Sequence, residues 1–283
     1  MNITWVRSLP TGKETGTYLA LDLGGTNLRV CVIHLKSNKS QHSITQSEYH
    51  IPADLKKGTA DQLWTYIADN LSKFLEEKNL LKEYNAENPI PLGFTFSYPA
   101  TQDKIDHGIL QRWTKGFDIS GVEGQDAAQQ LRDAMAARNL PVQLVALVND
   151  TVGAMIASAY YDPSTIIGGI FGTGCNAAYM EDCSSIPKLH PPSNSNKEES
   201  EQMAINCEYG AFDNRRQVLP ITEFDQEIDA QSPKPGEQTF EKMSAGLYLG
   251  EIFRLVLVKL ADRGLLFQDQ DLGKLKQSYI IDT

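Results

Sequence analysis

The segment that most constrains the fold is a hydrophobic run, Val142–Val148, that ends in Asn149-Asp150 and passes directly into a small-residue stretch. A buried strand that leads at once into a helix is typical of open α/β sheets, whose ligands bind at the carboxyl ends of the strands. A carboxylate there could act as a general base toward a hydroxyl group. Taken alone, the segment favours a simpler interpretation, in which Asn149 or Asp150 caps the helix.

The rest of the chain alternates expected strands and helices. Residues 17–23 and 28–35 are expected to form a hairpin around the turn Gly24-Gly25-Thr26-Asn27. Other strands are expected at residues 47–51, 90–96, 142–148, 166–171 and 177–180, and helices from residue 61 onward and at residues 126–139 and 151–161. Residues 240–260 are expected to form one long helix that is apolar nearly all round and therefore buried. Loops are expected at residues 182–202 and 231–238.

Composition narrows the class of partner. The chain of 283 residues has 26 basic and 36 acidic side chains and a net charge of -10, which argues against nucleic acid or an anionic membrane as a partner. No stretch has the length or apolarity of a membrane-spanning helix, and the first residues lack the pattern of a secretory signal. The four cysteines form no CxxC or CxxH pair, so a zinc site is not expected and the cytoplasm is the simplest location.

Two glycine turns could bind a polyphosphate. They are Asp22-Leu23-Gly24-Gly25-Thr26-Asn27 and Phe171-Gly172-Thr173-Gly174. Glycine permits positive φ and lets backbone N–H groups approach an anion closely. Asp22 could orient a magnesium ion through water, or it could serve only as a hydrogen-bond acceptor within the hairpin. Each turn alone is weak evidence, because most such turns are simply turns.

Several polar side chains stand in otherwise apolar settings. They are Ser97, Thr114, Lys115, Asn176, Glu208 and Glu241. Amides and carboxylates suit a polyhydroxyl ligand, because a site built to bind hydroxyl groups rejects analogues that lack them. Taken singly, each of these residues is more typical of a surface or capping position.

The ordered motifs of the chain resemble those of the hexokinases, most closely the fungal ones. The first phosphate segment is Leu21-Asp22-Leu23-Gly24-Gly25-Thr26-Asn27-Leu28-Arg29-Val30, and the sugar signature is Phe94-Thr95-Phe96-Ser97-Tyr98-Pro99 with Leu110-Gln111-Arg112-Trp113-Thr114-Lys115-Gly116-Phe117. The catalytic segment is Val148-Asn149-Asp150-Thr151-Val152-Gly153, and the second phosphate segment is Phe171-Gly172-Thr173-Gly174-Cys175-Asn176. The acidic sugar contacts lie in Asn206-Cys207-Glu208-Tyr209-Gly210-Ala211-Phe212 and Phe240-Glu241-Lys242-Met243.

The resemblance implies a role for each matching residue. Asp150 takes the proton of the sugar 6-hydroxyl, and Lys115 assists the transferring phosphoryl group. The implied sugar-binding residues are Ser97, Thr114, Lys115, Asn149, Asp150, Thr151, Asn176, Glu208 and Glu241. The implied MgATP-binding residues are Asp22, Leu23, Gly24, Gly25, Thr26, Asn27, Arg29, Gly172, Thr173 and Gly174.

The resemblance also implies an α/β, two-lobed actin-like ATPase or sugar kinase fold of the ribonuclease H-like type. The expected divisions are a connector over residues 1–16, a small lobe over 17–148 and an incomplete large lobe over 149–283. The implied activity is ATP- and Mg²⁺-dependent phosphorylation of glucose, fructose or mannose at O6 by a cytoplasmic monomer or homodimer.

Family members extend beyond both ends of this chain, so a truncated protein is expected. A non-catalytic glucose-binding fragment is therefore the alternative function. A bacterial-type sugar kinase is disfavoured, because those enzymes share the glycine turns but lack Trp113-Thr114-Lys115-Gly116-Phe117.

Overall fold

The computed structural model describes residues 1–36, 42–189 and 201–281. Its contacts divide the chain into two compact units. The sheet unit contains Asn2–Gly168 and Ala178–Asn206, and the helical unit contains Met1, Gly169–Ala177 and Cys207–Thr283. The expected lobe boundaries at residues 17 and 149 follow from the resemblance and stay a prediction. Most of the predicted loop at residues 182–202 lies outside the described residues.

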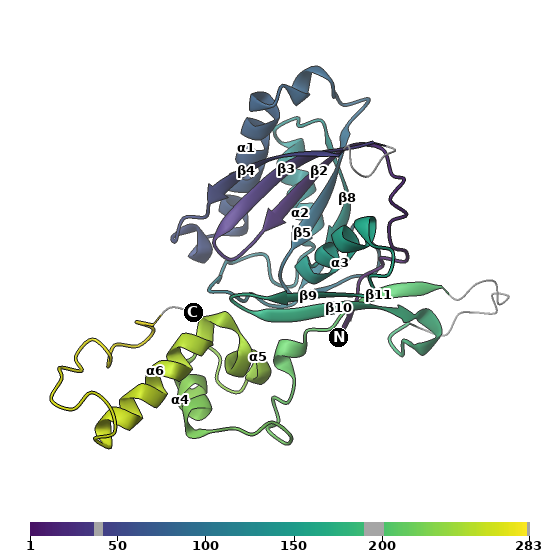
Figure 1. Cartoon of the computed structure of the whole chain (residues 1–283). Coiled ribbons are helices and arrows are strands. Elements are labelled where there is room, and N and C mark those ends of the chain that lie inside the picture. The colour runs from purple at the N-terminus through teal and green to yellow at the C-terminus, as the bar shows by residue number, and fades with distance from the viewer. Residues whose placement is uncertain (37–41, 190–200, 282–283) are drawn as a thin grey trace. The chain divides into compact units, whose positions relative to one another are not determined.

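A five-stranded sheet forms the framework of the sheet unit (Figure 1), with the strand order β4-β3-β2-β5-β8. Its strands are β2 (Gly16–Leu23), β3 (Asn27–Leu35), β4 (Ser43–His50), β5 (Ile90–Phe96) and β8 (Val142–Val148). The first three pair antiparallel, and β5 pairs parallel with both β2 and β8. The carboxyl ends of β2, β5 and β8 therefore lie at one edge of this sheet, where a ligand site is expected.

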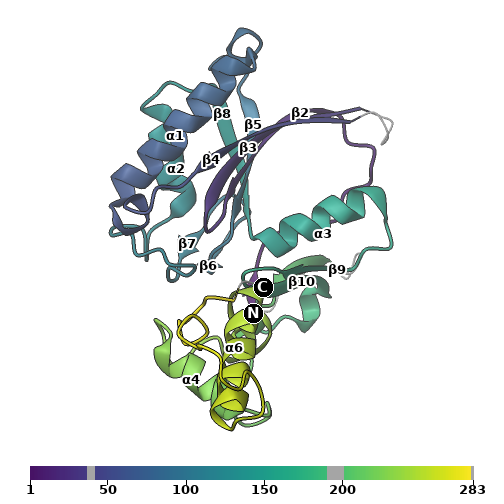
Figure 2. The same ribbon diagram turned by 60° about the vertical axis from the view of Figure 1, so that its left-hand side comes forward.

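Two helices cover one face of this sheet (Figure 2), α1 (Ala60–Glu77) and α2 (Ala127–Ala136). Thr59 is the N-cap of α1, and its hydroxyl forms a capping box with Gln62. Its buried face is built from apolar residues at helical spacing, among them Leu63, Ile67 and Leu71, which belong to the main hydrophobic cluster. The helix predicted from residue 61 onward is thus confirmed, and burial of its apolar face holds it on the sheet.

Helix α3 (Asp150–Tyr161) follows β8 directly and lies on the other side of the five-stranded sheet in Figure 2. A second sheet has the order β1-β11-β10-β9, formed by β1 (Asn2–Ile3), β9 (Ile167–Phe171), β10 (Cys175–Asp182) and β11 (Gln202–Asn206). Short strands β6 (Ala100–Thr101) and β7 (Ile109–Leu110) form a separate pair. Strand β11 and the two-residue strands β1, β6 and β7 were not predicted, whereas every predicted strand is present with boundaries shifted by a few residues.

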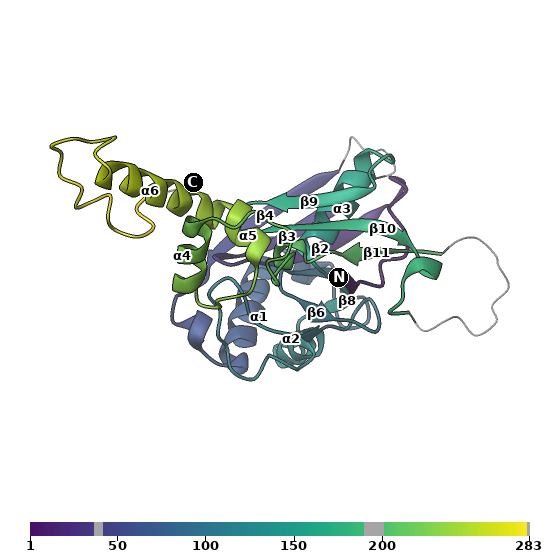
Figure 3. The ribbon, with the colours of Figure 1, turned by 90° about the horizontal axis from the view of Figure 1, so that it is seen from below.

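The helical unit contains α4 (Glu223–Gln231), α5 (Thr239–Ser244) and α6 (Gly246–Asp262), which pack against one another (Figure 3). Its buried residues include two sets of paired charges. Lys242 Nζ lies 2.6 Å from Asp229 Oδ1, and Arg216 also pairs with Asp229. Arg254 and Glu251 form the second pair at 2.6 Å, and both are at least 95% buried.

The prediction of one long buried helix at residues 240–260 is wrong. The helix is broken at Ala245, whose backbone is extended, with φ -85° and ψ 153°. The N–H of Gly246 donates to the carbonyl of Gly172 at 2.8 Å, and a Cβ on Gly246 would lie only 2.8 Å from that oxygen. The second glycine turn therefore packs at the break. Helix α6 also exposes Leu247, Leu249 and Phe253, so it is not buried all round.

Candidate active site

The two predicted catalytic side chains lie together in the sheet unit. Asp150 is the first residue of α3, directly after β8, and its Oδ2 lies 3.7 Å from Lys115 Nζ. Both side chains remain partly exposed, Lys115 at 32% and Asp150 at 26%. The carboxylate is therefore oriented by a cation and still accessible to a hydroxyl donor.

Asn149 caps α3, as the simpler interpretation of this segment required. Its Oδ1 accepts hydrogen bonds from the N–H and the hydroxyl of Thr151, at 3.1 and 2.7 Å. The N–H of Thr151 also donates to Asp150 Oδ1 at 2.9 Å. Because Asn149 forms the cap, Asp150 keeps its second oxygen available beside Lys115.

The loop that carries Lys115 is supported by a cluster of aromatic rings. Trp113 and Phe117 are buried and stacked, with ring centroids 5.3 Å apart. Between them, Lys115 has φ 57° and Gly116 has φ 80°. A lysine in the left-handed region is held there by its surroundings, a form of strain that is common at functional sites. Lys115 Nζ lies over the Tyr98 ring, 5.6 Å from its centroid.

Burial, followed by the charges of Asp22 and Asp150, strongly raises the pKa of Tyr98. Its hydroxyl donates to the carbonyl of Gly24 at 3.3 Å, which ties the aromatic cluster to the first glycine turn. Tyr98 was not among the predicted site residues. Its position beside Ser97 was the available signal.

The first glycine turn connects β2 and β3 and carries a network of charges. Asp22 and Arg29 face each other across the hairpin, and Arg29 Nη1 lies 3.2 Å from Asp22 Oδ2. Burial raises the pKa of Asp22, and the charge of Arg29 opposes this effect. Glu48, on β4, pairs with Arg29 at 3.3 Å and accepts a hydrogen bond from Asn27. Glu48 is a further neighbour that the sequence analysis missed, since only the strand register brings it opposite Arg29.

The expected use of positive φ in the two glycine turns is wrong. None of Gly24, Gly25, Gly172 and Gly174 has a positive φ. Two of them instead provide space for a neighbouring side chain. A Cβ on Gly25 would lie 3.4 Å from Lys115 Cβ, and a Cβ on Gly174 would lie 2.6 Å from Glu241 Oε2. Close approach of Glu241 thus explains Gly174, whereas the contact that a Cβ on Gly25 would make is close to an ordinary van der Waals distance.

The helical unit brings together its own set of predicted sugar-binding residues. The N–H of Glu208 donates to Asn176 Oδ1 at 2.9 Å, and Asn176 Nδ2 donates to Glu208 Oε1 at 3.5 Å. Glu208 has φ 52°, again in the left-handed region. Glu241 Oε2 accepts a hydrogen bond from the N–H of Cys175 at 3.0 Å. Thr173 belongs to the turn at the break between α5 and α6, where its carbonyl accepts from the N–H of Leu247.

The remaining predicted residues lie on the elements that the sequence indicated. Ser97 is buried directly after β5, and Thr114 is half-buried beside Lys115. Thr26 is exposed at the tip of the first turn. The predicted sugar-binding residues thus divide between the two units, with Asn176, Glu208 and Glu241 in the helical unit and the others in the sheet unit.

The described part of the chain contains no cluster of three or more His, Cys, Asp or Glu residues that could hold a metal ion. All four cysteines are free thiols. Cys175 is buried and Cys31 is half-buried. No helix among the described residues is both long enough and apolar enough to span a membrane.

Comparison with known proteins gives the same family over both parts of the chain. Two family models, both described as hexokinase, match residues 1–160 and residues 166–283. The chain is 56% identical to the hexokinase of Emericella nidulans and 54% identical to hexokinase-1 of Saccharomyces cerevisiae. These matches cover 100% and 99% of this chain, and the chain spans 57% of the length of each relative.

A solved structure, the hexokinase of Schistosoma mansoni complexed with glucose, has the same fold. It superposes with a TM-score of 0.85 at 39% identity, over 98% of this chain and 60% of that protein. The expected α/β actin-like ATPase fold is therefore present over the part of the family that this chain spans. The sequence motifs, the matched family models and the shared fold agree: the chain belongs to the hexokinase family.

Proposed function

We propose that the chain takes part in ATP-dependent phosphorylation of D-glucose, and of related hexoses such as fructose and mannose, at O6. The observation that carries this proposal is the placement of Asp150, partly exposed at the carboxyl end of β8, with its Oδ2 3.7 Å from Lys115 Nζ. Carboxylates that abstract a proton from a substrate hydroxyl recur in phosphoryl transfer, where positioning and charge stabilisation supply most of the catalysis.

In the proposed reaction Asp150 accepts the proton of the sugar 6-hydroxyl. The oxygen then forms a bond to the γ-phosphorus of ATP, the bond between that phosphorus and the β–γ bridging oxygen breaks, and ADP leaves. Lys115 balances the negative charge of the carboxylate and of the transferring group. Its left-handed backbone and the aromatic rings beneath it support a fixed position for the ammonium group.

The first glycine turn suits MgATP as the phosphoryl donor. Arg29 supplies a cation, the glycine turn supplies backbone N–H groups, and Thr26 supplies an exposed hydroxyl. Asp22 offers a half-buried carboxylate oxygen to a magnesium ion held through water. Gly172, Thr173 and Gly174 are proposed to contribute the second phosphate-binding turn.

The helical unit is proposed to bind the other sugar hydroxyls through Asn176, Glu208 and Glu241. Their oxygens accept hydroxyl donors, and the amide of Asn176 can donate in return. The relative whose solved structure superposes on this chain was complexed with glucose. Ser97, Thr114, Asn149 and Thr151 complete the proposed set on the sheet unit.

The test is glucose-dependent ADP production by the purified chain, measured beside Asp150→Ala. We expect turnover to fall by about 10²–10⁴-fold in the variant, which is the usual contribution of general base catalysis. Asp118→Ala, an exposed aspartate of the Lys115 loop, is the matched control and should retain the parent rate. Absence of turnover in a parent chain that still binds glucose would instead support the alternative, a non-catalytic glucose-binding fragment.

A further inference from the structure

Gln102, directly after β6, forms buried contacts with the strand that leads to Asp150. Gln102 is buried, with 8% of its surface exposed. Its Nε2 donates two hydrogen bonds, one to the carbonyl of Leu147 and one to the carbonyl of His107, both at 3.0 Å. Both donor hydrogens of the amide are thus used, and one of them fixes the end of β8 two residues before Asn149.

The segment that follows Gln102 also binds the backbone N–H of Leu147. The N–H of Leu147 donates to the carbonyl of Ile105 at 2.8 Å. The absence of a side chain at Gly108 permits this close approach, because a Cβ there would lie 3.0 Å from Leu147 Cδ2. Residues 102–108 therefore bind both backbone groups of Leu147, and they replace a neighbouring strand at this edge position.

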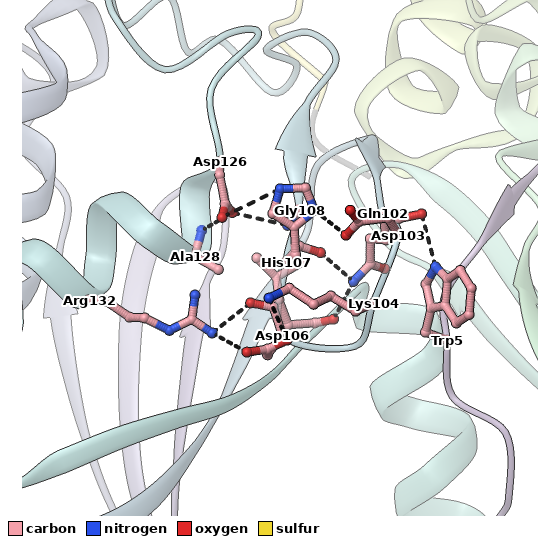
Figure 4. Close-up of polar contacts among 11 residues, drawn as sticks. Trp5, Gln102, Asp103, Lys104, Asp106, His107, Gly108, Asp126, Ala128 and Arg132 are labelled. Atoms are coloured by element: carbon pink, nitrogen blue, oxygen red, sulfur yellow. Dashed lines mark hydrogen bonds and ion pairs between the residues drawn. The ribbon is translucent and has the colours of Figure 1, made fainter.

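Residues 102–108 are themselves fixed by α2 and by its N-cap residue, Asp126 (Figure 4). Arg132 Nη2 donates to the carbonyl and to Oδ2 of Asp106, at 2.7 and 2.6 Å. The His107 ring lies between Asp103 and Asp126, with Nδ1 2.6 Å from the former and Nε2 3.6 Å from the latter. Asp126 Oδ1 also accepts from the N–H of Gly108 at 3.1 Å while it caps α2.

The backbone of Gln102 has a separate anchor on its other side. The indole N–H of Trp5 donates to the Gln102 carbonyl at 2.9 Å, as Figure 4 shows. Gln102 also lines the same small pocket as Asn149, together with Tyr98. Gln102 is thus held both at its side-chain amide and at its backbone carbonyl, and such locking of a supporting residue is what a precisely placed site requires.

We propose that Gln102 is a positioning residue for the Asn149–Asp150 junction. It acts through the Leu147 carbonyl and fixes where β8 ends and where α3 begins. A displacement of that junction would move the Asp150 carboxylate relative to Lys115, and sites of this kind tolerate only about 0.5 Å of error. The catalytic consequence rests on the proposed function, whereas the positioning of the junction does not.

The first experiment measures local order without any ligand. Gln102→Glu keeps the shape of the side chain and removes both donors, and Gln102→Met is a second variant without charge. The reporters are the amides of Thr151 and Gly153, which are bonded to Asn149 and Asp150 oxygens and to the Asn149 carbonyl respectively. We expect both amides to exchange with deuterium about ten-fold faster in the variants, with exchange in α1 unchanged.

Gln111→Ala is the matched control. Gln111 is an exposed glutamine of the same hairpin, and its Nε2 donates to Thr101 Oγ1 rather than to β8. It should leave the Thr151 and Gly153 amides unaffected. Lowering the pH should slow exchange again in Gln102→Glu, after correction for the intrinsic rate, because the protonated carboxyl regains one donor. Unchanged exchange in both Gln102 variants would overturn the proposal.

The second experiment asks whether the positioning matters for the sugar. The glucose dissociation constant is measured by calorimetry for the parent, Gln102→Glu, Asp150→Ala and the double variant. If Gln102 acts through the junction, the double variant should bind glucose no more weakly than Asp150→Ala alone. If the losses of glucose affinity in the two single variants added up in the double variant, Gln102 would not act through the Asn149–Asp150 junction. A parent chain that does not bind glucose would contradict the proposed function, while the exchange result would still decide the role of Gln102.

Discussion

The sheet unit and the helical unit are stabilised in different ways. Among the described residues, the three hydrophobic clusters all belong to the sheet unit, and the largest includes fully buried side chains such as Phe74 and Phe94. The helical unit buries a few apolar side chains, such as Ile228 and Leu255, and it also buries charged pairs, with Asp229 paired to Lys242 and Glu251 paired to Arg254. It also leaves Leu247 and Phe253 exposed on α6.

This difference indicates that the two units respond to different perturbations. Burial of apolar area is non-directional and is spread over many side chains, so the sheet unit depends on volume and packing. A buried ion pair depends on both partners, because the loss of one leaves an uncompensated charge. The helical unit should therefore be sensitive to single charge changes and to pH.

The largest effect is expected from Lys242→Ala. This substitution leaves Asp229 buried with fewer partners, and it should destabilise the helical unit by about 3–5 kcal/mol. Hydrogen exchange in α4, α5 and α6 measures the loss. Lys259→Ala is the control, since Lys259 pairs with the exposed Glu223 and should cost less than about 1 kcal/mol. Equal effects of the two substitutions would contradict the assigned role of the buried pair.

A slightly smaller effect is expected from Leu71→Ala in the sheet unit. Leu71 lies on the buried face of α1, is fully buried and belongs to the main cluster. Removal of its side chain should cost about 2–5 kcal/mol, measured as faster exchange throughout the sheet unit. Leu81→Ala, at a residue that is 40% exposed, should have little effect. If exchange in α6 rose as much as in the sheet unit, the two units would not be energetically distinct.

Acidification should separate the units. Burial would raise the pKa of Asp229, but hydrogen bonds from Lys242 and Gly236 and the nearby positive charges outweigh it and lower the pKa. Hydrogen bonds from Arg254 lower the pKa of Glu251 in the same way, against the effect of burial. Carboxylates with lowered pKa stabilise the fold at neutral pH, and this contribution is lost as the pH falls below about 4, their ordinary range, toward the folded-state pKa.

The opposite sign applies to Asp22 in the sheet unit. Burial raises its pKa, so its charged form disfavours the fold at neutral pH, and protonation on acidification relieves that cost. Exchange measured from pH 7 to pH 3 should therefore show the helical unit opening first. Opening of the sheet unit before the helical unit would contradict this expectation.

The smallest effects are expected from substitutions of two similar helix N-cap residues. Thr59 is the N-cap of α1 and Thr222 is the N-cap of α4, and each forms a capping box with the residue three positions later. Each Thr→Ala substitution should cost about 1 kcal/mol. Local exchange should rise more in α4, because few buried apolar side chains hold that helix in place. A larger rise in α1 would indicate that the cap, and not the core, secures the sheet unit.

The parts of the fold that the sequence predicted are those in which apolar periodicity coincides with burial. The spacing of Leu63, Ile67 and Leu71 predicted α1 because these side chains face one core. The catalytic junction was also predictable, since a buried strand, a capping residue and a carboxylate are adjacent in the chain. The junction contains both a helix cap and a candidate general base, because Asn149 caps α3 and Asp150 lies beside Lys115.

The features that the sequence could not predict depend on contacts between distant segments. The break at Ala245 arises where Gly246 meets the carbonyl of Gly172, and no local signal marks it. Glu48 and Gln102 belong to ordinary polar stretches, and only strand register and loop packing bring them to the site. The apolar pattern of residues 240–260 likewise gave no indication that Lys242 and Glu251 form buried ion pairs.

The positions of the three tryptophans have an optical consequence. Trp5, Trp64 and Trp113 all belong to the sheet unit, and each indole N–H is hydrogen-bonded within it. Tryptophan fluorescence therefore reports on that unit alone, while the helical unit contributes only tyrosine emission, from Tyr209, Tyr248 and Tyr279. A melt followed at the tryptophan wavelengths would look like a single transition even if the helical unit had already unfolded at a lower temperature.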